Sequence, residues 1–308
     1  MTSVIEINGL RKVYSGVRGG ETVAVAGLDL DVPEGGVFGF LGPNGSGKTT
    51  TIRCLLGLAR PTSGQLKVLG APTPAGLPHV IARVGAIVET PALFPTMTAR
   101  ENLRLLAAID KVGKRRVDEM LEFVDLSDRA DDKVRKYSLG MRQRLGMAAA
   151  LLKDPALVIL DEPANGLDPA GIRQTRELLR NLAAEGRTVL VSSHQLSEVE
   201  QTCDRVAIID GGRCILQGKV DEVLASAVQP ALLVDLCDRA AGAATLRAAG
   251  IPVDEMETFL RVGVSRIDAA HVTKLLADQG LYVTEMLPER VSLEDLFLEV
   301  TEHERIPA

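Results

Sequence analysis

Alternating apolar and polar residues open the chain. The pattern in Val4–Ile7 and again in Val23–Val32 predicts two half-buried antiparallel strands. A glycine-rich stretch, Gly16–Gly20, separates them. We therefore expect a small antiparallel β-layer at the start of the chain.

From Val37 onward the pattern changes to short apolar strands that are each followed by a helix. Three such pairs can be assigned: Val37–Leu41 with Thr49–Leu58, Ala156–Leu160 with Pro169–Ala184, and Thr188–Ser192 with Gln195–Thr202. Alternation of this kind is typical of a parallel sheet with helices on its faces. Asp168 as N-cap and Pro169 in the first helical position mark the start of the second helix.

The stretch between Ala99 and Lys153 is helical throughout, which predicts a helical subdomain inserted into the sheet (about 99–153). Near Asp221 the chain becomes rich in Ala and Leu. The expected elements there are strand 232–236, helix 240–249, strands 251–254 and 258–264, helix 267–279, strand 281–287 and a closing helix from Ser292. This order fits a small ferredoxin-like α+β unit. We expect two domains, residues 1–220 and 221–308.

The composition is that of an ordinary globular protein. The chain has 308 residues, 46% of them hydrophobic and 25% charged, which argues against disorder. The net charge of −6 argues against a protein that coats nucleic acid. No window contains the roughly 18 consecutive apolar residues that a membrane span requires. Glu6 and Arg11 interrupt any signal-peptide core, so a cytoplasmic protein is expected.

The four cysteines are Cys54, Cys203, Cys214 and Cys237, and no two of them form a C-x-x-C pair. Neither a zinc site nor a disulfide framework is indicated. We interpret all four as buried thiols in a reducing compartment.

The strongest chemical signal is the segment GPNGSGKTT, which lies between a predicted strand and a predicted helix. It matches the phosphate-binding pattern G-x-x-x-x-G-K-[ST] in the structural context that pattern requires. Backbone N–H groups and the positive end of the helix favour an anion. Lys48 can reach the β- and γ-phosphates of a nucleotide, and the Thr49 hydroxyl can ligate Mg²⁺. The predicted nucleotide-binding residues are Gly42, Pro43, Asn44, Gly45, Ser46, Gly47, Lys48, Thr49 and Thr50.

Two adjacent carboxylates end the apolar strand of LVILDEP. Burying two acids is costly unless a cation or solvent meets them. Asp161, at the tip of the strand beside the phosphate loop, suits coordination of Mg²⁺ through water. Glu162 is placed to polarise an attacking water. Together with the phosphate loop, these residues indicate a nucleotide hydrolase.

Three further segments indicate which kind of hydrolase this is. KYSLGMRQRLGMAAALL (136–152) combines Ser138 with the Gly140 N–H at a helix N-terminus, a phosphate-capping arrangement that is common when taken alone. NGLDPAG (165–171) and VLVSSH (189–194) follow. With all five motifs in order, the first 220 residues resemble the ATP-binding cassette (ABC) family.

The resemblance implies a P-loop NTPase cassette that works as a homodimer. Each of two ATP molecules would lie between the phosphate loop of one copy and the signature segment of the other. Ser138 and Gly140 would contact the γ-phosphate across the interface, and Asp168 would link the two sites. Glu162 would be the general base, and His194 would hydrogen-bond the γ-phosphate.

Tyr14 stands at the aromatic position ahead of the phosphate loop, where the family stacks a side chain on adenine. The alternative is that Tyr14 is a strand residue packed in the core. Two positions depart from the family pattern. The signature reads YSLGM rather than LSGGQ, and Glu89 replaces the usual lid glutamine. A carboxylate can still ligate Mg²⁺, so Glu89 remains a predicted metal ligand with Thr49 and Asp161.

Both departures resemble the bacitracin- and lantibiotic-type exporter ATPases. The segment SLEDLFLEVT (292–301) resembles the tail of bacitracin and daunorubicin exporter subunits. The resemblance therefore implies the ATP-hydrolysing subunit of a drug or antibiotic exporter, held at the inner face of the membrane by a separate multi-span permease. Residues 91–102 would receive that permease, and no direct nucleic acid binding is expected. The alternative is a soluble cassette ATPase that acts on ribosomes or DNA, although the chain has one cassette and no long coiled coil.

Overall fold

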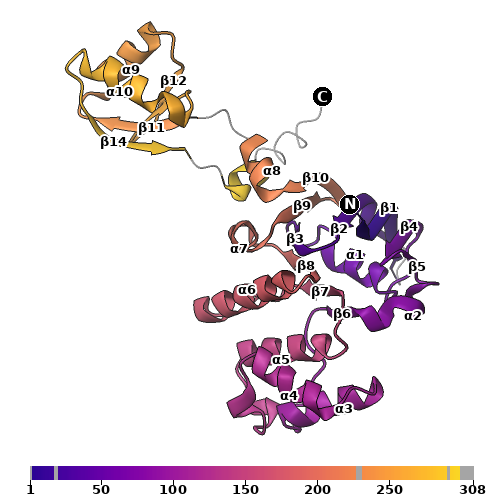
Figure 1. Cartoon of the computed structure of the whole chain (residues 1–308). Helices are drawn as coiled ribbons and strands as arrows, with labels where there is room; N and C mark the ends of the chain where they lie inside the picture. Colours follow the sequence, from indigo (N-terminus) through magenta and orange to yellow (C-terminus); the bar gives the residue numbers. More distant parts are fainter. Residues whose placement is uncertain (1, 17–19, 227–230, 290–291, 299–308) are drawn as a thin grey trace. The chain divides into compact units, whose positions relative to one another are not determined.

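The computed structural model describes residues 2–16, 20–226, 231–289 and 292–298. The chain divides into two compact units, Met1–Val220 and Asp221–Ala308, and each has its own apolar core (Figure 1). The two units are described separately below.

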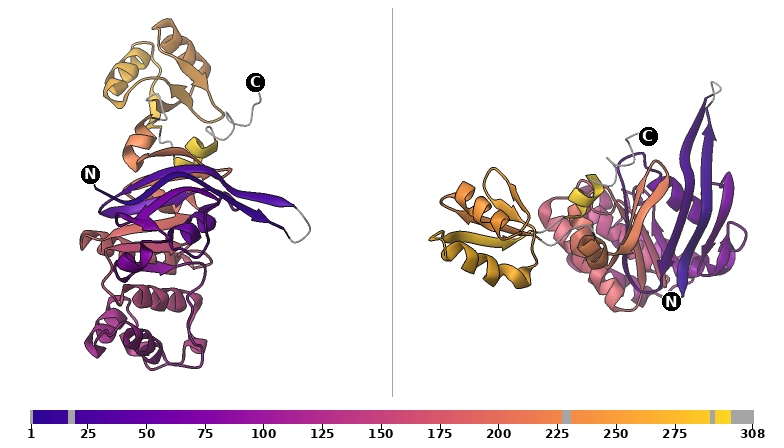
Figure 2. Two further views of the ribbon diagram at one scale, coloured as in Figure 1. Left: turned by 90° about the vertical axis from the view of Figure 1, so that its right-hand side faces the viewer. Right: turned by 90° about the horizontal axis from the view of Figure 1, so that it is seen from above.

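The N-terminal strands form an antiparallel sheet, as the alternating pattern predicts. Its order is β2 (Glu21–Pro33), β1 (Ser3–Ser15), β4 (Ser63–Val68) and β5 (Ala71–Thr73). Ile5, Ile7 and Leu10 of β1 are buried in the core of the unit. Figure 2 shows β1 and β2 as a long curved hairpin. The short strands β4 and β5 were not predicted, because they gain their structure from pairing with β1 and with each other.

A second, six-stranded sheet carries the phosphate loop. Its order is β10 (Arg213–Lys219), β9 (Arg205–Asp210), β3 (Gly36–Leu41), β8 (Thr188–Ser193), β7 (Leu157–Asp161) and β6 (Val84–Ile87). All neighbours are parallel except β10, which runs antiparallel to β9. The expected parallel sheet is therefore present, with β3, β8 and β7 where the apolar runs place them. The carboxyl ends of these three strands lie together at one edge.

Helices α1 (Lys48–Leu55), α2 (Leu77–Val80), α6 (Pro169–Ala184) and α7 (Leu196–Thr202) complete the sheet-bearing part of the unit. Helix α6 begins and ends at the predicted residues. Its start is set locally, because the Asp168 carboxylate accepts a hydrogen bond from the Gly171 N–H at 3.0 Å and Pro169 needs no donor at that position.

The helical subdomain consists of α3 (Ala99–Ile109), α4 (Lys114–Phe123) and α5 (Leu139–Leu151). Residues 124–138 between α4 and α5 form turns and two short 3₁₀ helices, so this part of the predicted helical stretch is not α-helical. Figures 1 and 2 show the three helices gathered beyond the β6 edge of the sheet. Helix α8 (Val220–Ser226) follows β10, the last strand of the six-stranded sheet.

The C-terminal unit has the predicted order of elements. These are β11 (Leu232–Leu236), α9 (Arg239–Ala248), β12 (Val253–Glu255), β13 (Leu260–Val262), α10 (Ala269–Ala277) and β14 (Val283–Pro288). Their sheet order is β12-β13-β11-β14, antiparallel throughout. Alternate residues of β11 are buried against α9 and α10. Residues 293–298 are helical, in line with the expected closing helix, while 299–301 of the SLEDLFLEVT segment lie outside the described residues.

The cysteines are not all buried. Cys54 and Cys203 are buried, Cys214 is half-buried and Cys237 is exposed. The expectation was therefore wrong for Cys237, which follows β11 on the turn into α9, where the chain faces solvent. Among the described residues, no helix has both the length and the apolar character needed to cross a bilayer.

Candidate functional site

The loop between β3 and α1 passes close to the backbone of the neighbouring strand β2. Gly47 adopts a positive φ of 103°, and a Cβ placed on it would lie 2.6 Å from the carbonyl oxygen of Ala24. The Ser46 hydroxyl is buried and has no hydrogen-bond partner among the described residues. A buried hydroxyl without a partner is costly, so it fits a loop that closes on a hydrogen-bonding ligand. The predicted anion cradle is thus present at the start of α1.

Lys48 is buried at the centre of this loop. Its Nζ donates hydrogen bonds to the carbonyl oxygens of Gly42 at 2.7 Å and Pro43 at 3.2 Å, and it lies 3.5 Å from Oε1 of Glu162. The ammonium group therefore braces the loop from inside. It also brings the loop next to the acidic end of β7.

The side chains of Thr49 and Asp161 meet, although 112 positions separate them. The Thr49 hydroxyl donates a hydrogen bond to Oδ2 of Asp161 at 2.8 Å. Hydroxyl and carboxylate oxygens are the ligand types that Mg²⁺ prefers. Two of the three predicted metal ligands are therefore adjacent, and their chemistry fits that ion.

Ser192 holds the same carboxylate from the other side and was not predicted as a site residue. Its hydroxyl donates to Oδ1 of Asp161 at 2.6 Å and accepts a hydrogen bond from the Glu162 N–H at 2.9 Å. The contact follows from sheet register, because Asp161 and Ser192 are paired positions of β7 and β8. A hydroxyl two residues before His194, at the end of a strand, is the sequence signal that could have identified it.

Glu162 and His194 also meet. Nδ1 of His194 lies 2.7 Å from Oε2 of Glu162, and both side chains are partly buried. Glu162 has a positive φ of 50°, which is uncommon for a residue with a side chain. Such backbone strain is often found at functional sites. It turns the carboxylate toward Lys48 and His194 at the end of β7.

These groups share a cavity of about 430 Å³, which is in the range of small-molecule sites. Asn165, which the sequence analysis did not select, contributes to its wall. The cavity is lined by Thr22, Val23, Ala24, Asn44, Gly45, Gly47, Lys48, Thr49, Thr50, Glu162, Asn165 and His194.

Tyr14 lies on the hairpin strand beside this cavity. It pairs with Thr22, one of the lining residues, and Nζ of Lys12 lies 4.6 Å from the centre of its ring. Its side chain is 39% exposed, which excludes the alternative that Tyr14 packs in the core. An exposed ring at the edge of a cavity is available for stacking.

Ser138 and Asp168 cap two different helices. The Ser138 hydroxyl accepts a hydrogen bond from the Met141 N–H at 3.2 Å at the start of α5, and Asp168 caps α6. Neither residue, nor Gly140, lines the cavity around Lys48. The structure therefore does not bring them to the phosphate loop of their own chain.

Glu89 is the third predicted metal ligand, and the structure does not bring it to Asp161. Its Oε1 lies 2.5 Å from Nη2 of Arg53 on α1, and its side chain is largely exposed. Glu89 also has a positive φ, 64°. The Glu89 carboxylate is therefore engaged in an exposed ion pair with Arg53.

Comparison with known proteins decides the family. A family model described as "ABC transporter" matches residues 25–165. The bacitracin transport ATP-binding protein BcrA of Bacillus licheniformis is 39% identical over 307 residues, which is 97% of this chain and 98% of that one. The chain belongs to the ABC transporter ATP-binding proteins. This ABC transporter ATPase is also 36% identical to the daunorubicin resistance ATP-binding protein DrrA3 of Streptomyces coeruleorubidus, over 98% of this chain and 97% of that one.

Solved structures of ABC proteins share its cassette fold. The cbiO1 structure from Clostridium perfringens, described as part of an ABC transporter complex, matches with a TM-score of 0.65 and 28% identity over 73% of this chain and 92% of that one. A dimeric cassette, MJ0796 bound to ADP and Pi, matches with a TM-score of 0.64 and 25% identity, over 70% and 98% of the two chains. The ABC ATPase therefore has the P-loop cassette fold that its motifs predict, with a mixed, mainly parallel sheet and an antiparallel sheet.

Proposed function

We propose that two copies of this ABC ATPase bind two ATP molecules between them and hydrolyse them to drive export through a separate membrane permease. One observation carries the hydrolytic part of the proposal: Lys48, Thr49, Glu162 and His194 line one cavity, and Asp161 contacts Thr49 beside it, so that three separate segments of the chain meet there. Phosphoryl transfer requires a cation beside the phosphates, oxygen ligands for a metal ion, and groups that accept or donate a proton. The side chains in this site are of these types.

Within one copy, each residue of the phosphate loop has a part in binding. Backbone N–H groups between Gly42 and Gly47 and the Ser46 hydroxyl would donate hydrogen bonds to phosphate oxygens. Lys48 would give up its hydrogen bonds to carbonyl oxygens and contact the β- and γ-phosphates instead. Thr49 and Asp161 would hold Mg²⁺, with Glu89 as a further ligand once it leaves Arg53. The metal would neutralise charge that develops on the phosphate oxygens.

Glu162 is proposed as the general base and His194 as its partner. A carboxylate in contact with an imidazole can accept a proton from water, while the imidazole holds its orientation and can donate to a phosphate oxygen. Tyr14 would stack on the adenine ring, since it is exposed beside the cavity.

The second copy would supply Ser138, Gly140 and Asp168. This assignment rests on the position of Ser138 and Asp168 at helix N-termini, which favour anions, and on their place outside the cavity of their own chain. Because ATP would be held between the two copies, the dimer would form only with nucleotide bound, and hydrolysis would allow it to open again. The permease would respond to closure of the dimer with a conformational change of its own.

Export of a drug, antibiotic peptide or similar amphiphile is the transport function that the relatives favour. The bacitracin and daunorubicin proteins match this chain over nearly its full length, so the similarity includes the C-terminal unit. We therefore place the ATPase in the cytoplasm, at the inner face of the membrane, bound to a multi-span permease through the surface around residues 91–102. Phe94 on that surface is 51% exposed.

We infer that the C-terminal unit is a ferredoxin-like accessory domain. Its β-α-β-β-α-β order and its β12-β13-β11-β14 sheet support this, because the two helices cover one face of a four-stranded antiparallel sheet. We propose a dimer-stabilising or permease-regulating role for this domain. Deleting residues 221–308 should lower transport or dimer formation, and unchanged ATPase, dimer and transport would remove any such role.

The test of the transporter assignment is affinity purification of tagged Glu162→Gln protein, with Mg-ATP, from detergent-solubilised membranes. We expect one multi-span membrane protein at near-equal stoichiometry, identified by mass spectrometry. The same tag on Lys48→Ala protein is the control for nucleotide dependence. Recovery of ribosomes or DNA-bound proteins without a permease would favour the second candidate, a soluble cassette ATPase, and leave the hydrolytic site standing.

A further inference from the structure

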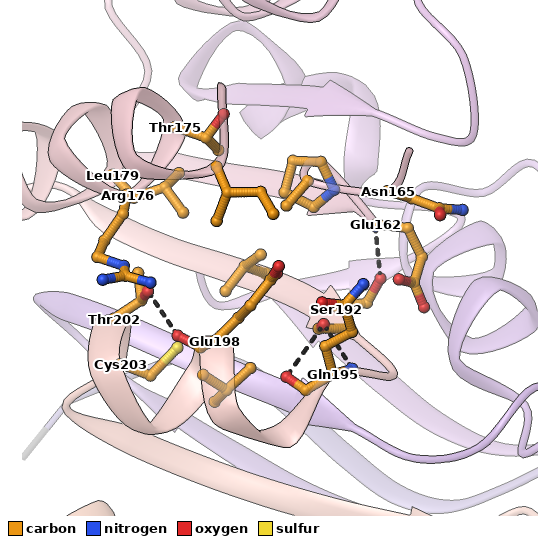
Figure 3. Close-up of a pocket in the computed structure, with 16 residues that line it drawn as sticks. Glu162, Asn165, Thr175, Arg176, Leu179, Ser192, Gln195, Glu198, Thr202 and Cys203 are labelled. Carbon is orange, nitrogen blue, oxygen red and sulfur yellow. Dashed lines mark hydrogen bonds between the residues drawn. The ribbon is translucent and has the colours of Figure 1, made fainter. Parts of the chain in front are cut away.

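A second, smaller cavity lies between α6 and α7, behind the hydrolytic groups. Thr175 and Arg176 of α6 and Glu198 of α7 are among the residues that line it (Figure 3). Glu162 and Ser192 line its other end. Its volume is about 30 Å³, which is enough for water but not for a nucleotide or metabolite.

Three buried polar atoms in the walls of this cavity have no hydrogen-bond partner within the part of the chain that the structure describes. They are Oγ1 of Thr175, Nε of Arg176 and Oε1 of Glu198. Buried polar groups are nearly always hydrogen-bonded to protein or to ordered water. The walls are otherwise largely apolar, but three such atoms from two helices supply the polar partners that a bridging water needs. The cavity therefore joins α6 to α7 by polar contacts rather than by apolar packing alone.

The position of α7 depends on these contacts. Helix α7 has only seven residues, and Gln195 at its N-cap makes no side-chain capping bond. A helix this short is not stable on its own, so packing must hold it. At its far end, Nη2 of Arg180 donates a hydrogen bond to the carbonyl oxygen of Gln201 at 2.5 Å. At its near end, the cavity with Glu198 provides the polar link to α6.

Both helices begin at residues of the hydrolytic machinery. His194 lies two residues before the first residue of α7, and Asp168 caps α6. A shift of α7 relative to α6 would move His194 away from Glu162, with which it makes a 2.7 Å contact. Displacement of catalytic groups by an ångström is enough to slow a reaction strongly.

We propose that Glu198 is a positioning residue of the hydrolytic site: through water shared with Thr175 and Arg176 it fixes α7 against α6 and so holds His194 against Glu162. The inference rests on the proposed roles of Glu162 and His194.

The electrostatics of the cavity agree with this role. Burial raises the pKa of the Glu198 carboxyl, while the charges of Arg176 and His194 lower it and that of Glu162 raises it again. Glu198 is thus electrostatically coupled to both hydrolytic groups without touching them. The hydrogen bonds of Glu198 are the part that we assign to the positioning of His194, and replacement by Gln separates them from its charge.

The test compares steady-state hydrolysis of Mg-ATP by full-length wild type, Glu198→Ala, Glu198→Gln and Ser197→Ala. We expect Glu198→Ala to lower kcat about tenfold with KM for ATP within about twofold of wild type, because geometry rather than binding is lost. Glu198→Gln keeps the shape and most of the hydrogen bonding and should restore most of kcat. Ser197→Ala changes an exposed neighbouring residue of α7 that does not line the cavity, so it is the matched control and should keep wild-type kcat.

A readout that needs no turnover separates this inference from the proposed function. The ring resonances of His194, assigned by NMR with a His194→Gln variant, should shift in Glu198→Ala and not in Ser197→Ala. If wild type hydrolyses no ATP while His194 still shifts, the proposed function fails and the positioning role stands. Wild-type kcat and unshifted His194 resonances in folded Glu198→Ala would overturn the inference. Should that variant not fold, Thr175→Val removes one hydroxyl from the same cavity at nearly equal volume and is held to the same two readouts.

Discussion

Nδ1 of His194 lies 2.7 Å from Oε2 of Glu162, so the imidazole and the carboxylate are in direct contact. The other oxygen of this carboxylate lies 3.5 Å from Lys48. Glu162 therefore stands between the cation of the phosphate loop and the histidine that precedes α7. These two contacts fix the orientation of the carboxylate at the end of β7, and a general base must be held in place in this way.

Replacing Glu162 with Gln should stop hydrolysis while leaving nucleotide binding intact. The amide keeps the shape but cannot accept the proton, so we expect kcat to fall at least about a hundredfold. ATP then persists between two copies, and light scattering with Mg-ATP should report a stable dimer. The Lys48→Ala, Glu162→Gln double variant is the control and should remain monomeric. A Glu162→Gln protein that stays monomeric at saturating Mg-ATP would count against the dimer mechanism.

Ser138 has two proposed tasks, and two substitutions separate them. Ser138→Ala removes the cap of α5 and should destabilise the fold by about 1 kcal/mol. Ser138→Asp keeps a good cap, so thermal stability should stay near wild type, but its carboxylate would repel a phosphate. In the Glu162→Gln background we expect Ser138→Asp to abolish the ATP-dependent dimer. A dimer of normal affinity in that protein would mean that Ser138 does not face the γ-phosphate.

The ion pair between Arg53 and Glu89 should compete with metal binding. An exposed pair contributes at most about 1 kcal/mol, so Arg53→Gln should lower the Mg²⁺ concentration for half-maximal hydrolysis by no more than about fivefold. Added salt should act on wild type in the same direction and leave the variant unchanged. The Glu89→Gln variant, alone and combined with Arg53→Gln, completes a double-mutant cycle. Identical Mg²⁺ dependence in all four proteins would exclude Glu89 as a ligand.

Tyr14 is predicted to recognise the base and not the phosphates. Tyr14→Ala should weaken ATP binding by about 1 kcal/mol, about fivefold, and Tyr14→Phe should bind as wild type because the ring remains. Inorganic tripolyphosphate, which lacks a base, should bind all three proteins equally. Calorimetric titration measures each affinity. An equal loss for ATP and tripolyphosphate in Tyr14→Ala would indicate a general disturbance of the hairpin instead of stacking.

Much of the fold could be predicted because its signals are local. Helix α6 carries its own start signal in Asp168 and Pro169, and β3, β7 and β8 are continuous apolar runs. Strands such as β5, with three residues, and β6, with four, lack a pattern long enough to be read, and pairing with distant segments creates them. The exposure of Cys237 could not be predicted either, because it depends on where the turn after β11 lies relative to solvent.

By itself, the sequence determined the phosphate loop, its lysine and the acidic end of β7, because a loop that binds phosphate through its own backbone is encoded within nine consecutive residues. Only the tertiary structure decided which side chains meet. The register of β7 and β8 brings Ser192 to Asp161, the α6–α7 packing encloses Glu198, and the loop after β6 delivers Glu89 to Arg53. These contacts join residues that lie far apart in the chain, so they depend on how the strands and helices pack together, which no local pattern reports.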